Sequence, residues 1–583
     1  MKSSLFLLLT AMLFAGRGRA APGEADPPPA DVRQLLVRAI LSEGGPEQLK
    51  LLGQLGESGD KAVVDVLSAW SRDSLYLYPA PDGAKVPVLL EEGEDAAGKK
   101  RAQRIDNGQF LKDQHGSDLR FGSTDLSSVD TDMRLRGSIQ QTLDTLALAA
   151  PEPEARRSAA LKLGNSQKQR NLAVLQARLP KETDRHVLRA LKEGIALIQL
   201  GSAEAKVQLA AVEQLELLNS IGSLENLRAL MSRPGCPREV ARAAKLAIHS
   251  IEEHIWVVNV FGTIFHGISL GSILLVVALG LAITFGLMGI INMAHGEMIA
   301  VGAYACYVVQ NLFAAGFGFS MTLPISFGGK PLSLGLHLPG LNASGWVYET
   351  YFLVALPVSF LSAALAGLLI ERTVIRFLYR RPLESLLATW GISLAMQQCF
   401  RMVFGANNVQ VNSPSWLLGH FVINDVIFGY NRVFVIGFAI VIVVGTWLLL
   451  TKTSLGLLIR AVMQNRNMAA CVGVRTNRVN MLTFAFGSGL AGLAGAFLSQ
   501  IGNVGPSLGQ TYIVDSFMTV VLGGVGSIVG TVYSALGIGT ADQVLQQTTG
   551  SPVTGKIVVL VSIIVFLQWK PGGLFSARSR SLD

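Results

Sequence analysis

The stretch Ser269–Tyr304 reads SLGSILLVVALGLAITFGLMGIINMAHGEMIAVGAY. No Asp, Glu, Lys or Arg occurs between Glu253 and Glu297, and none again until Lys330. A membrane-spanning helix needs about 20 mostly apolar residues, because the hydrocarbon layer disfavours charged side chains. This stretch therefore predicts helices that cross a membrane, and the rest of the chain is interpreted around it.

Polar residues interrupt this apolar stretch at INMAHGE, which contains Asn292, His295 and Glu297. Polar groups at membrane depth are costly unless they face protein or a water-filled path. Two interpretations remain open at this point. The segment is either a short polar turn at the cytoplasmic surface or part of the lining of a transport path.

The composition separates two parts of the chain. Half of the 583 residues are hydrophobic, 15% are charged and 61 are glycine, which is typical of a protein that lies partly in lipid. Most charges precede residue 255 or so, and long uncharged runs follow. We therefore expect a soluble half followed by a membrane half.

The net charge of +8 does not indicate nucleic-acid binding here. Many arginines lie in short loops between apolar runs, which is the charge bias of cytoplasmic loops in membrane proteins. The four cysteines show no disulfide or metal-ligand spacing, so we expect no metal site and no internal disulfide.

Residues 1–20 resemble a secretory signal peptide, with Lys2 before an apolar run and small residues before a cleavage site after Ala20. We expect four regions: a signal peptide at 1–20, a soluble extracytoplasmic domain at 21–254, a transmembrane permease domain at 255–575 and a tail at 576–583.

The predicted soluble domain has mainly helical spacing of its apolar residues. Tyr76, Tyr78, Val86 and Val88 suggest a small strand element within it. Helical segments then recur at loosely regular intervals after residue 132, which favours a HEAT-like helical repeat; an irregular helical bundle is the alternative. No catalytic residues are recognised in this half.

The membrane half contains about eight apolar runs of near-spanning length. They lie at about 265–288, 293–313, 351–370, 385–404, 433–450, 481–500, 512–539 and 557–569. The fold class predicted from these patterns is mainly α, a polytopic membrane protein with a preceding extracytoplasmic domain.

Basic residues in two loops set the expected orientation. Clusters at 372–381 and 452–478 belong in the cytoplasm by the positive-inside rule, which places residues 21–254 outside. The same count puts the C-terminus outside, whereas Lys570, Arg578 and Arg580 favour the inside. The run at 512–539 contains LGGVGSIVG, which could break one helix into two.

The segment GLAITFGLMGIINMAHGEMIAVGAY, residues 280–304, resembles the signature of permease subunits in branched-chain amino-acid-type ABC importers. The segment RRPLESLLATWGISLAMQQ, residues 380–398, and the N-terminal domain resemble the urea-importing branch of that family. The resemblance covers about residues 265–575. It implies an inner-membrane permease of a bacterium that receives urea or a related small amide from an extracytoplasmic binding protein.

The resemblance also implies a coupling loop within residues 454–478, which would dock a cytoplasmic ATPase. Its matching residues are Arg460, Ala461, Ala469, Ala470 and Gly473, although Met468 stands where other ABC permeases have Glu. The chain has no GxxxxGK[ST] loop, so ATP would be used by partner subunits and no cofactor would bind this chain. A merely solvated basic loop is the alternative.

Glycines suggest where helices pack closely, because small side chains let helices approach each other in lipid. These are Gly487, Gly492, Gly495, Gly523, Gly524 and Gly526.

A substrate path through the membrane half is expected to use polar, uncharged contacts, because a small amide needs hydrogen bonds rather than a countercharge. We assign Asn292, His295 and Glu297 to this path, with Gln397 and Gln398 behind them. The expected partners are a second permease subunit, ATPases, the binding protein and membrane lipid. The alternatives are a branched-chain amino-acid permease, a passive urea or amide channel, or an ion-coupled carrier.

Overall fold

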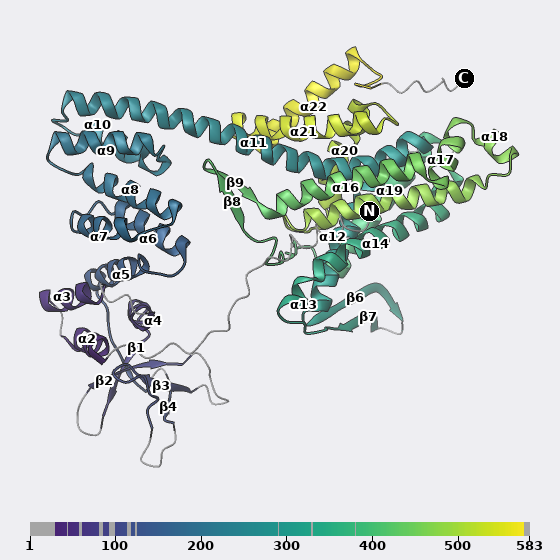
Figure 1. The fold of residues 1–583 in the computed structure, drawn as a ribbon. Helices are drawn as coiled ribbons and strands as arrows, with labels where there is room; N and C mark the ends of the chain where they lie inside the picture. Colours follow the sequence, from purple (N-terminus) through teal and green to yellow (C-terminus); the bar gives the residue numbers. More distant parts are fainter. Residues whose placement is uncertain are drawn as a thin grey trace, which may run out of the picture. The chain divides into compact units, whose positions relative to one another are not determined.

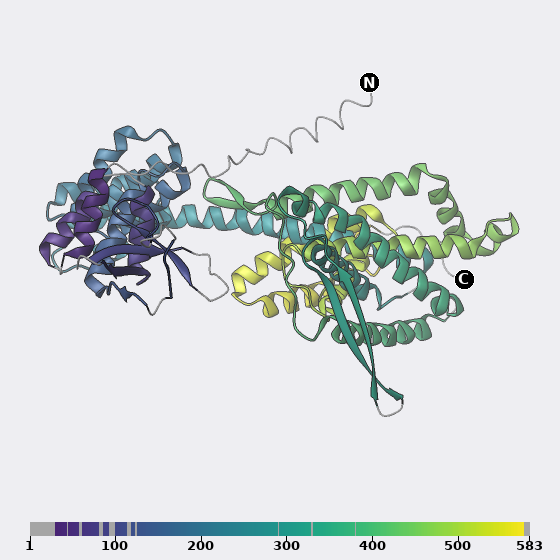
Figure 2. The ribbon, with the colours of Figure 1, turned by 90° about the horizontal axis from the view of Figure 1, so that it is seen from below.

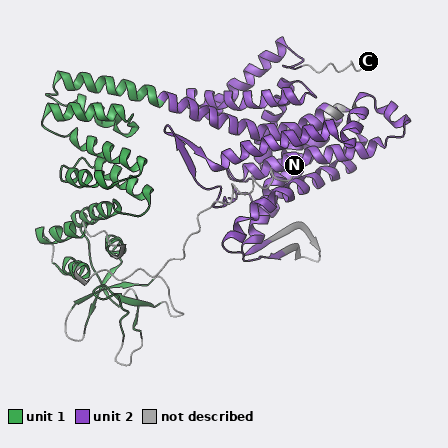
Figure 3. Ribbon diagram, viewed as in Figure 1, with its two compact units in different colours: residues 1–255 green, residues 256–583 purple. Residues whose placement is uncertain are grey.

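The computed structural model describes residues 30–42, 45–56, 61–80, 85–91, 99–112, 118–122, 125–289, 291–327, 330–378 and 381–575 (Figure 1). The predicted signal peptide, the C-terminal tail, Arg380, Arg578 and Arg580 lie outside the described residues. The described chain is mainly helical and forms two compact units, residues 1–255 and 256–583 (Figure 3).

Unit 1 begins with three short helices that pack around the fully buried Trp70. A five-stranded antiparallel sheet follows in the order β4-β3-β2-β1-β5, and its first two strands contain the predicted Tyr76, Tyr78, Val86 and Val88. The bounds are α2 Ala30–Leu41, α3 Pro46–Leu55, α4 Lys61–Ser71, β1 Leu75–Pro79, β2 Lys85–Leu90, β3 Lys100–Arg104, β4 Arg120–Phe121 and β5 Ser127–Ser128.

The rest of unit 1 consists of helices that pack on neighbours close in sequence, α5 on α6, α6 and α7 on α8, and α8 on α9. Asp132 and Asp184 cap α5 and α8 by accepting hydrogen bonds from free backbone N–H groups of the first turn. The bounds are α5 Met133–Ala147, α6 Pro153–Asn165, α7 Arg170–Arg178, η1 Leu179–Lys181, α8 Arg185–Gln199, α9 Ala205–Leu217, η2 Ile221–Ser223 and α10 Leu224–Met231.

Helix α11, Arg238–Met288, is continuous over 51 residues and runs from unit 1 into unit 2. The other helices of unit 2 are α12 His295–Phe313, α13 Trp346–Glu349, α14 Tyr351–Thr373, η3 Ile375–Phe377, α15 Pro382–Phe404, α16 Tyr430–Lys452, α17 Ser454–Gln464, α18 Arg466–Cys471, α19 Thr476–Leu498, α20 Leu508–Gly523, α21 Ile528–Thr549 and α22 Pro552–Trp569. Two hairpins join them, β6 Gly316–Phe327 with β7 Lys330–Pro339, and β8 His420–Ile423 with β9 Val426–Gly429.

Five helices of the described chain are long and apolar enough to cross a membrane. They are Arg238–Gly286, Trp346–Phe377, Tyr430–Lys452, Thr476–Leu498 and Pro552–Trp569. The apolar segments of α14, α16 and α22 are mostly exposed, as expected for lipid-facing helices, whereas those of α11 and α19 are mostly buried.

Helices α12, α14 and α19 pack on one another within unit 2, and glycine lets α19 approach both neighbours. The hairpin of β6 and β7 extends away from the helices of unit 2 (Figure 2). A Cβ added to Gly495 would lie 1.9 Å from the carbonyl oxygen of Ile299 on α12, and one added to Gly492 would lie 2.4 Å from the Cβ of Ala363 on α14. Either substitution would force the helices apart.

The predicted run at 512–539 is two helices. Helix α20 ends at Gly523 and α21 begins at Ile528, and between them Gly524 and Gly526 have φ values of +99° and +84°. This backbone region favours glycine because it has no Cβ. The break that LGGVGSIVG allowed is therefore present.

Candidate substrate path and coupling surface

Helix α15 carries a buried polar stripe. Ser385, Thr389, Ser393 and Gln397 recur every fourth residue, so they lie on one face of the helix, and all four are buried. The other faces carry exposed apolar side chains, namely Leu383, Leu387, Trp390 and Leu394. The polar face therefore points into the protein.

The first half of the stripe contacts the backbone that joins α11 to α12. Ser385 Oγ donates to the carbonyl oxygen of Ile291 at 3.4 Å, and Thr389 Oγ1 accepts from the Met293 N–H at 3.1 Å. Within that connection, Asn292 Oδ1 accepts from the Ala294 N–H at 3.0 Å. These bonds satisfy buried backbone groups outside the helices.

The second half of the stripe contacts Glu297 at the start of α12. Glu297 is 1% exposed, and its Oε1 accepts from Ser393 Oγ at 2.9 Å and from Gln397 Nε2 at 2.8 Å. Its Oε2 has no partner among the described residues, and it forms no ion pair there. Buried carboxyl oxygens normally have partners, so Oε2 is available to a donor that enters from outside the protein.

His295 lies at a different contact. It is fully buried, and its Nε2 is 3.3 Å from the carbonyl oxygen of Val277 on α11, while Nδ1 has no partner in the described chain. It packs beside Gly280, where a Cβ would lie 3.1 Å from His295 Cε1 and 2.3 Å from the Gly487 carbonyl oxygen.

Of the five residues assigned to the path from sequence, Glu297 and Gln397 are brought into direct contact. Asn292 and His295 flank Glu297 and bond to backbone. Gln398 is exposed on another face of α15, and the structure does not bring it to the others. Sequence analysis missed Ser385, Thr389 and Ser393, although their four-residue spacing with Gln397 is a recognisable signal.

A second buried polar cluster lies at the other end of α12. Gln310 Nε2 donates to Tyr348 Oη and to the Asn412 carbonyl oxygen, both at 3.1 Å. Tyr351 Oη donates to the same carbonyl, and Gln500 Nε2 lies 3.5 Å from Tyr351 Oη. Since a helix rises about 1.5 Å per residue, this cluster lies about 20 Å along α12 from Glu297.

A third polar group joins α20, α21 and α22. Lys556 Nζ lies 3.3 Å from Asp515 Oδ2, and the nearby Asp542 is buried, with Oδ2 accepting from Gln546 Nε2 at 2.7 Å. Asp515, Asp542 and Lys556 line a cavity of about 20 Å³. Helix α21 extends past the predicted run at 512–539 and therefore includes Asp542.

The expected coupling loop forms two short helices, α17 and α18. Thr453 and Asn465 cap them, and Gly473 ends the second with φ +88°. Arg460, Ala461 and Ala470 are exposed, whereas Ala469 is buried.

This segment also exposes three apolar side chains: Leu457 on α17, Met468 on α18, and Val472, which directly follows α18. Leu457 is 61% exposed, Met468 63% and Val472 73%. Exposed apolar residues among basic ones are typical of a surface that docks another protein.

Comparison with known proteins identifies the family to which this chain belongs. A model of the family "Branched-chain amino acid transport system / permease component" matches residues 263–567, just over half of the chain. This chain belongs to that permease family.

Relatives of the permease match the same part of the chain. The "High-affinity branched-chain amino acid transport system permease protein BraD" of Pseudomonas aeruginosa is 25% identical over 316 residues, which cover 53% of this chain and 93% of the relative. The permease protein LivH of Escherichia coli K12, named for the same transport system, is 25% identical over 313 residues, with the same coverage. No solved structure matches the chain.

Membership of this permease family gives the general function of the chain. The chain is a membrane-embedded permease, a transport subunit of an ABC transporter, and such permeases work with ATPases and substrate-binding proteins. The region that the family model matches begins within α11, so unit 1 lies before it.

Proposed function

We propose that this permease forms the translocation path of an ATP-driven importer, with Glu297, Ser393 and Gln397 in contact with the substrate. The observation that carries the proposal is the unpartnered Oε2 of the buried Glu297. The other oxygen of this carboxyl group accepts from one hydroxyl donor, Ser393, and from one amide donor, Gln397. The site offers hydrogen bonds to a small polar molecule, which is what passage of a hydrophilic substrate through an apolar region requires.

Two substrate classes are candidates. The names of the relatives favour a branched-chain amino acid, because they match the permease unit along nearly their whole length. Urea or a related small amide is favoured by the resemblance at residues 380–398, which includes the polar stripe. An amide offers N–H donors to Glu297 Oε2, and its carbonyl oxygen can accept the Gln397 N–H that now donates to Ser393 Oγ at 3.3 Å. An aliphatic amino acid also needs apolar contacts.

The coupling surface completes the proposal. Helices α17 and α18 would dock a cytoplasmic ATPase through Leu457, Arg460, Met468 and Val472, and ATP would act only on that partner. A second permease subunit would form the other wall of the path, and unit 1 would lie on the extracytoplasmic side of a bacterial inner membrane.

Uptake by cells that express the complete transporter separates the substrates. Isotope-labelled urea and labelled leucine are supplied in parallel, each with an excess of the other as competitor. Uptake of urea that leucine does not reduce supports the amide, and the reverse result supports the amino acid. If neither accumulates above cells that lack the permease, both assignments are wrong.

A further inference from the structure

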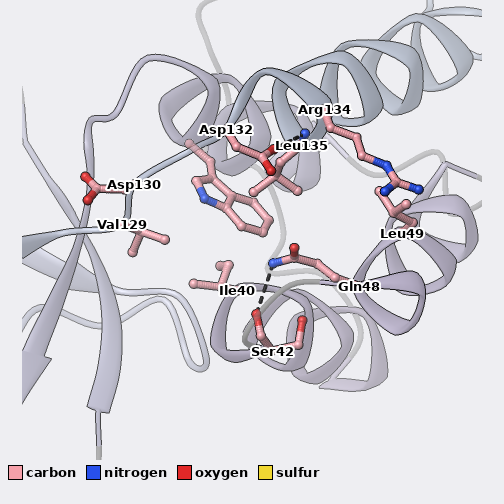
Figure 4. A pocket seen from close by; sticks show the side chains of 11 residues that line it. Ile40, Ser42, Gln48, Leu49, Val129, Asp130, Asp132, Arg134 and Leu135 are labelled. Carbon is pink, nitrogen blue, oxygen red and sulfur yellow. Dashed lines mark hydrogen bonds between the residues drawn. The ribbon is translucent and has the colours of Figure 1, made fainter.

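Unit 1 contains a cavity of about 400 Å³, which is within the range of small-molecule sites (Figure 4). It lies between the end of α2, helix α3 and the first turn of α5, with Trp70 of α4 and the residues that follow β5 in its lining. The transport function proposed above does not use this cavity.

Two buried polar side chains line the cavity with unused hydrogen-bonding capacity. Gln48 is 6% exposed, and its Nε2 donates to the carbonyl oxygens of Ala39 and Ser42 at 2.9 and 3.2 Å. Its own carbonyl oxygen points into the cavity and meets no donor in the described chain (Figure 4). Trp70 is fully buried, and its indole N–H has no partner among the described residues. Since such groups are normally paired, a ligand is the expected partner.

The exposed rim carries both signs of charge. Asp130 and Asp132 lie two residues apart at the start of α5, and Arg134 follows on its first turn (Figure 4). Asp132 Oδ1 accepts from the Leu135 N–H at 2.6 Å, which leaves its second oxygen for another donor. Arg134 forms no ion pair with any described residue. The rim therefore suits a molecule that carries a cation and an anion close together.

The remaining walls are apolar, and Ile40, Leu49 and Leu135 provide them. A ligand that fills the cavity therefore needs a hydrocarbon body as well as its charges. Urea is neutral and has no such body, so it would leave both the apolar walls and the rim charges unsatisfied.

We propose that this cavity binds a free α-amino acid with an aliphatic side chain. The ammonium group lies beside the Asp132 carboxylate and reaches the Gln48 carbonyl oxygen, while Asp130 on the outer side of the rim adds negative charge (Figure 4). The carboxylate pairs with the Arg134 guanidinium, and the side chain packs on the apolar walls.

Titration calorimetry on the purified full-length chain tests this site. The probes are L-leucine, 3-methylbutylamine, which lacks the carboxylate, 4-methylpentanoate, which lacks the ammonium group, and urea. We expect leucine to bind and each analogue to bind at least about tenfold more weakly, because each loses a charged contact. No binding of leucine at millimolar concentration, or tighter binding of urea, overturns the proposal.

Variants assign the leucine signal to this cavity. The double variant Asp130→Asn with Asp132→Asn removes both charges but keeps an N-cap for α5, because Asn caps as well as Asp. It and Arg134→Gln should each weaken leucine binding at least about tenfold. Arg157→Gln, an exposed arginine on α6 outside the cavity, is the matched control and should bind as the parent does.

A variant in the other unit separates this site from the transport path. Leucine binding should persist in Glu297→Gln, since that residue lies in unit 2. Binding that is lost in Glu297→Gln and retained in the double aspartate variant places leucine in the membrane unit and refutes the cavity site. Uptake is measured separately, so failure of the transport proposal leaves this result interpretable.

Discussion

At the scale of residues, two adjacent glutamines on α15 differ in burial and in their contacts. Gln397 is buried and donates to Glu297, whereas Gln398 is exposed on another face. Gln397→Leu removes a hydrogen bond to a buried carboxyl group, worth about 1.5–3 kcal/mol. We expect uptake to fall at least about tenfold in Gln397→Leu and to change less than about twofold in Gln398→Leu. Equal losses in both variants would contradict the assigned path.

The sequence analysis treated these two residues alike, because it did not use the polar spacing that marks the buried face of the helix. Successive residues on a helix point about 100° apart, so one of two neighbouring glutamines generally faces away from a partner helix. The four-residue spacing of Ser385, Thr389, Ser393 and Gln397 was present in the sequence and identifies the buried face. The contact with Glu297 joins residues about a hundred positions apart, and only the fold reveals it.

An ion pair in unit 1 gives a pH prediction. The Arg156 guanidinium binds Glu182 through two hydrogen bonds, at 2.8 and 3.0 Å, and lowers the pKa of the Glu182 carboxyl to about 2. Because the carboxyl group has a lower pKa in the folded protein, the ion pair stabilises the fold fully at pH values above the unfolded pKa of about 4.5. This stabilisation is lost as the pH falls from 4.5 towards 2.

Glu182→Gln should therefore destabilise unit 1 by about 2 kcal/mol at pH 7, and the difference from the parent should shrink below pH 4.5 or so. Pulse proteolysis of the full-length chain in increasing denaturant measures this difference. Glu154→Gln, whose carboxylate pairs with Arg157 on the exposed surface, is the control and should have little effect. A pH-independent effect of Glu182→Gln would show that lost packing, not charge, causes it.

At the scale of elements, helices α17 and α18 should couple the permease to its ATPase. Arg460→Glu reverses an exposed charge on α17, and Gly473→Val places a Cβ at φ +88°, which strains the end of α18 by about 1–2 kcal/mol. We expect both variants to insert normally and to lose ATP-driven uptake. Arg372→Gln, an exposed arginine in the last turn of α14, is the control and should keep ATP-driven uptake. Normal uptake in both coupling variants would refute the coupling role.

The elements that sequence predicts well are those with a strong apolar period. The long helices of unit 2 and the first strands of unit 1 lie where their patterns place them. The hairpin of β6 and β7 was not predicted, because residues 316–339 lie between two predicted helices and were assigned no structure.

The break between α20 and α21 changes the count of crossings. Sequence analysis allowed it but could not decide it, because adjacent glycines suit both a close helix contact and a turn. If α20 and α21 each crossed the membrane, the chain would have one more passage than predicted, and Lys570 after α22 would lie on the cytoplasmic side. That agrees with the preference of basic residues for this side.

At the scale of the whole molecule, the orientation of unit 1 is open to direct test. The basic residues of segments 372–381 and 452–478 predict that unit 1 lies outside the cytoplasm. Protease added to intact spheroplasts should therefore digest unit 1 and leave a fragment that contains α12–α22. A unit that is digested only after the membrane is opened would reverse the orientation, and the predicted signal peptide would then be wrong as well.

The central claim is that this permease moves its substrate only when an ATPase partner hydrolyses ATP. The most direct measurement is uptake by proteoliposomes that contain the chain with its co-purified partners, with the loaded binding protein outside and ATP enclosed. We predict accumulation against a gradient with ATP and none with a non-hydrolysable analogue. Equilibration of labelled substrate in vesicles that contain this chain alone, without ATP, would instead show a passive channel.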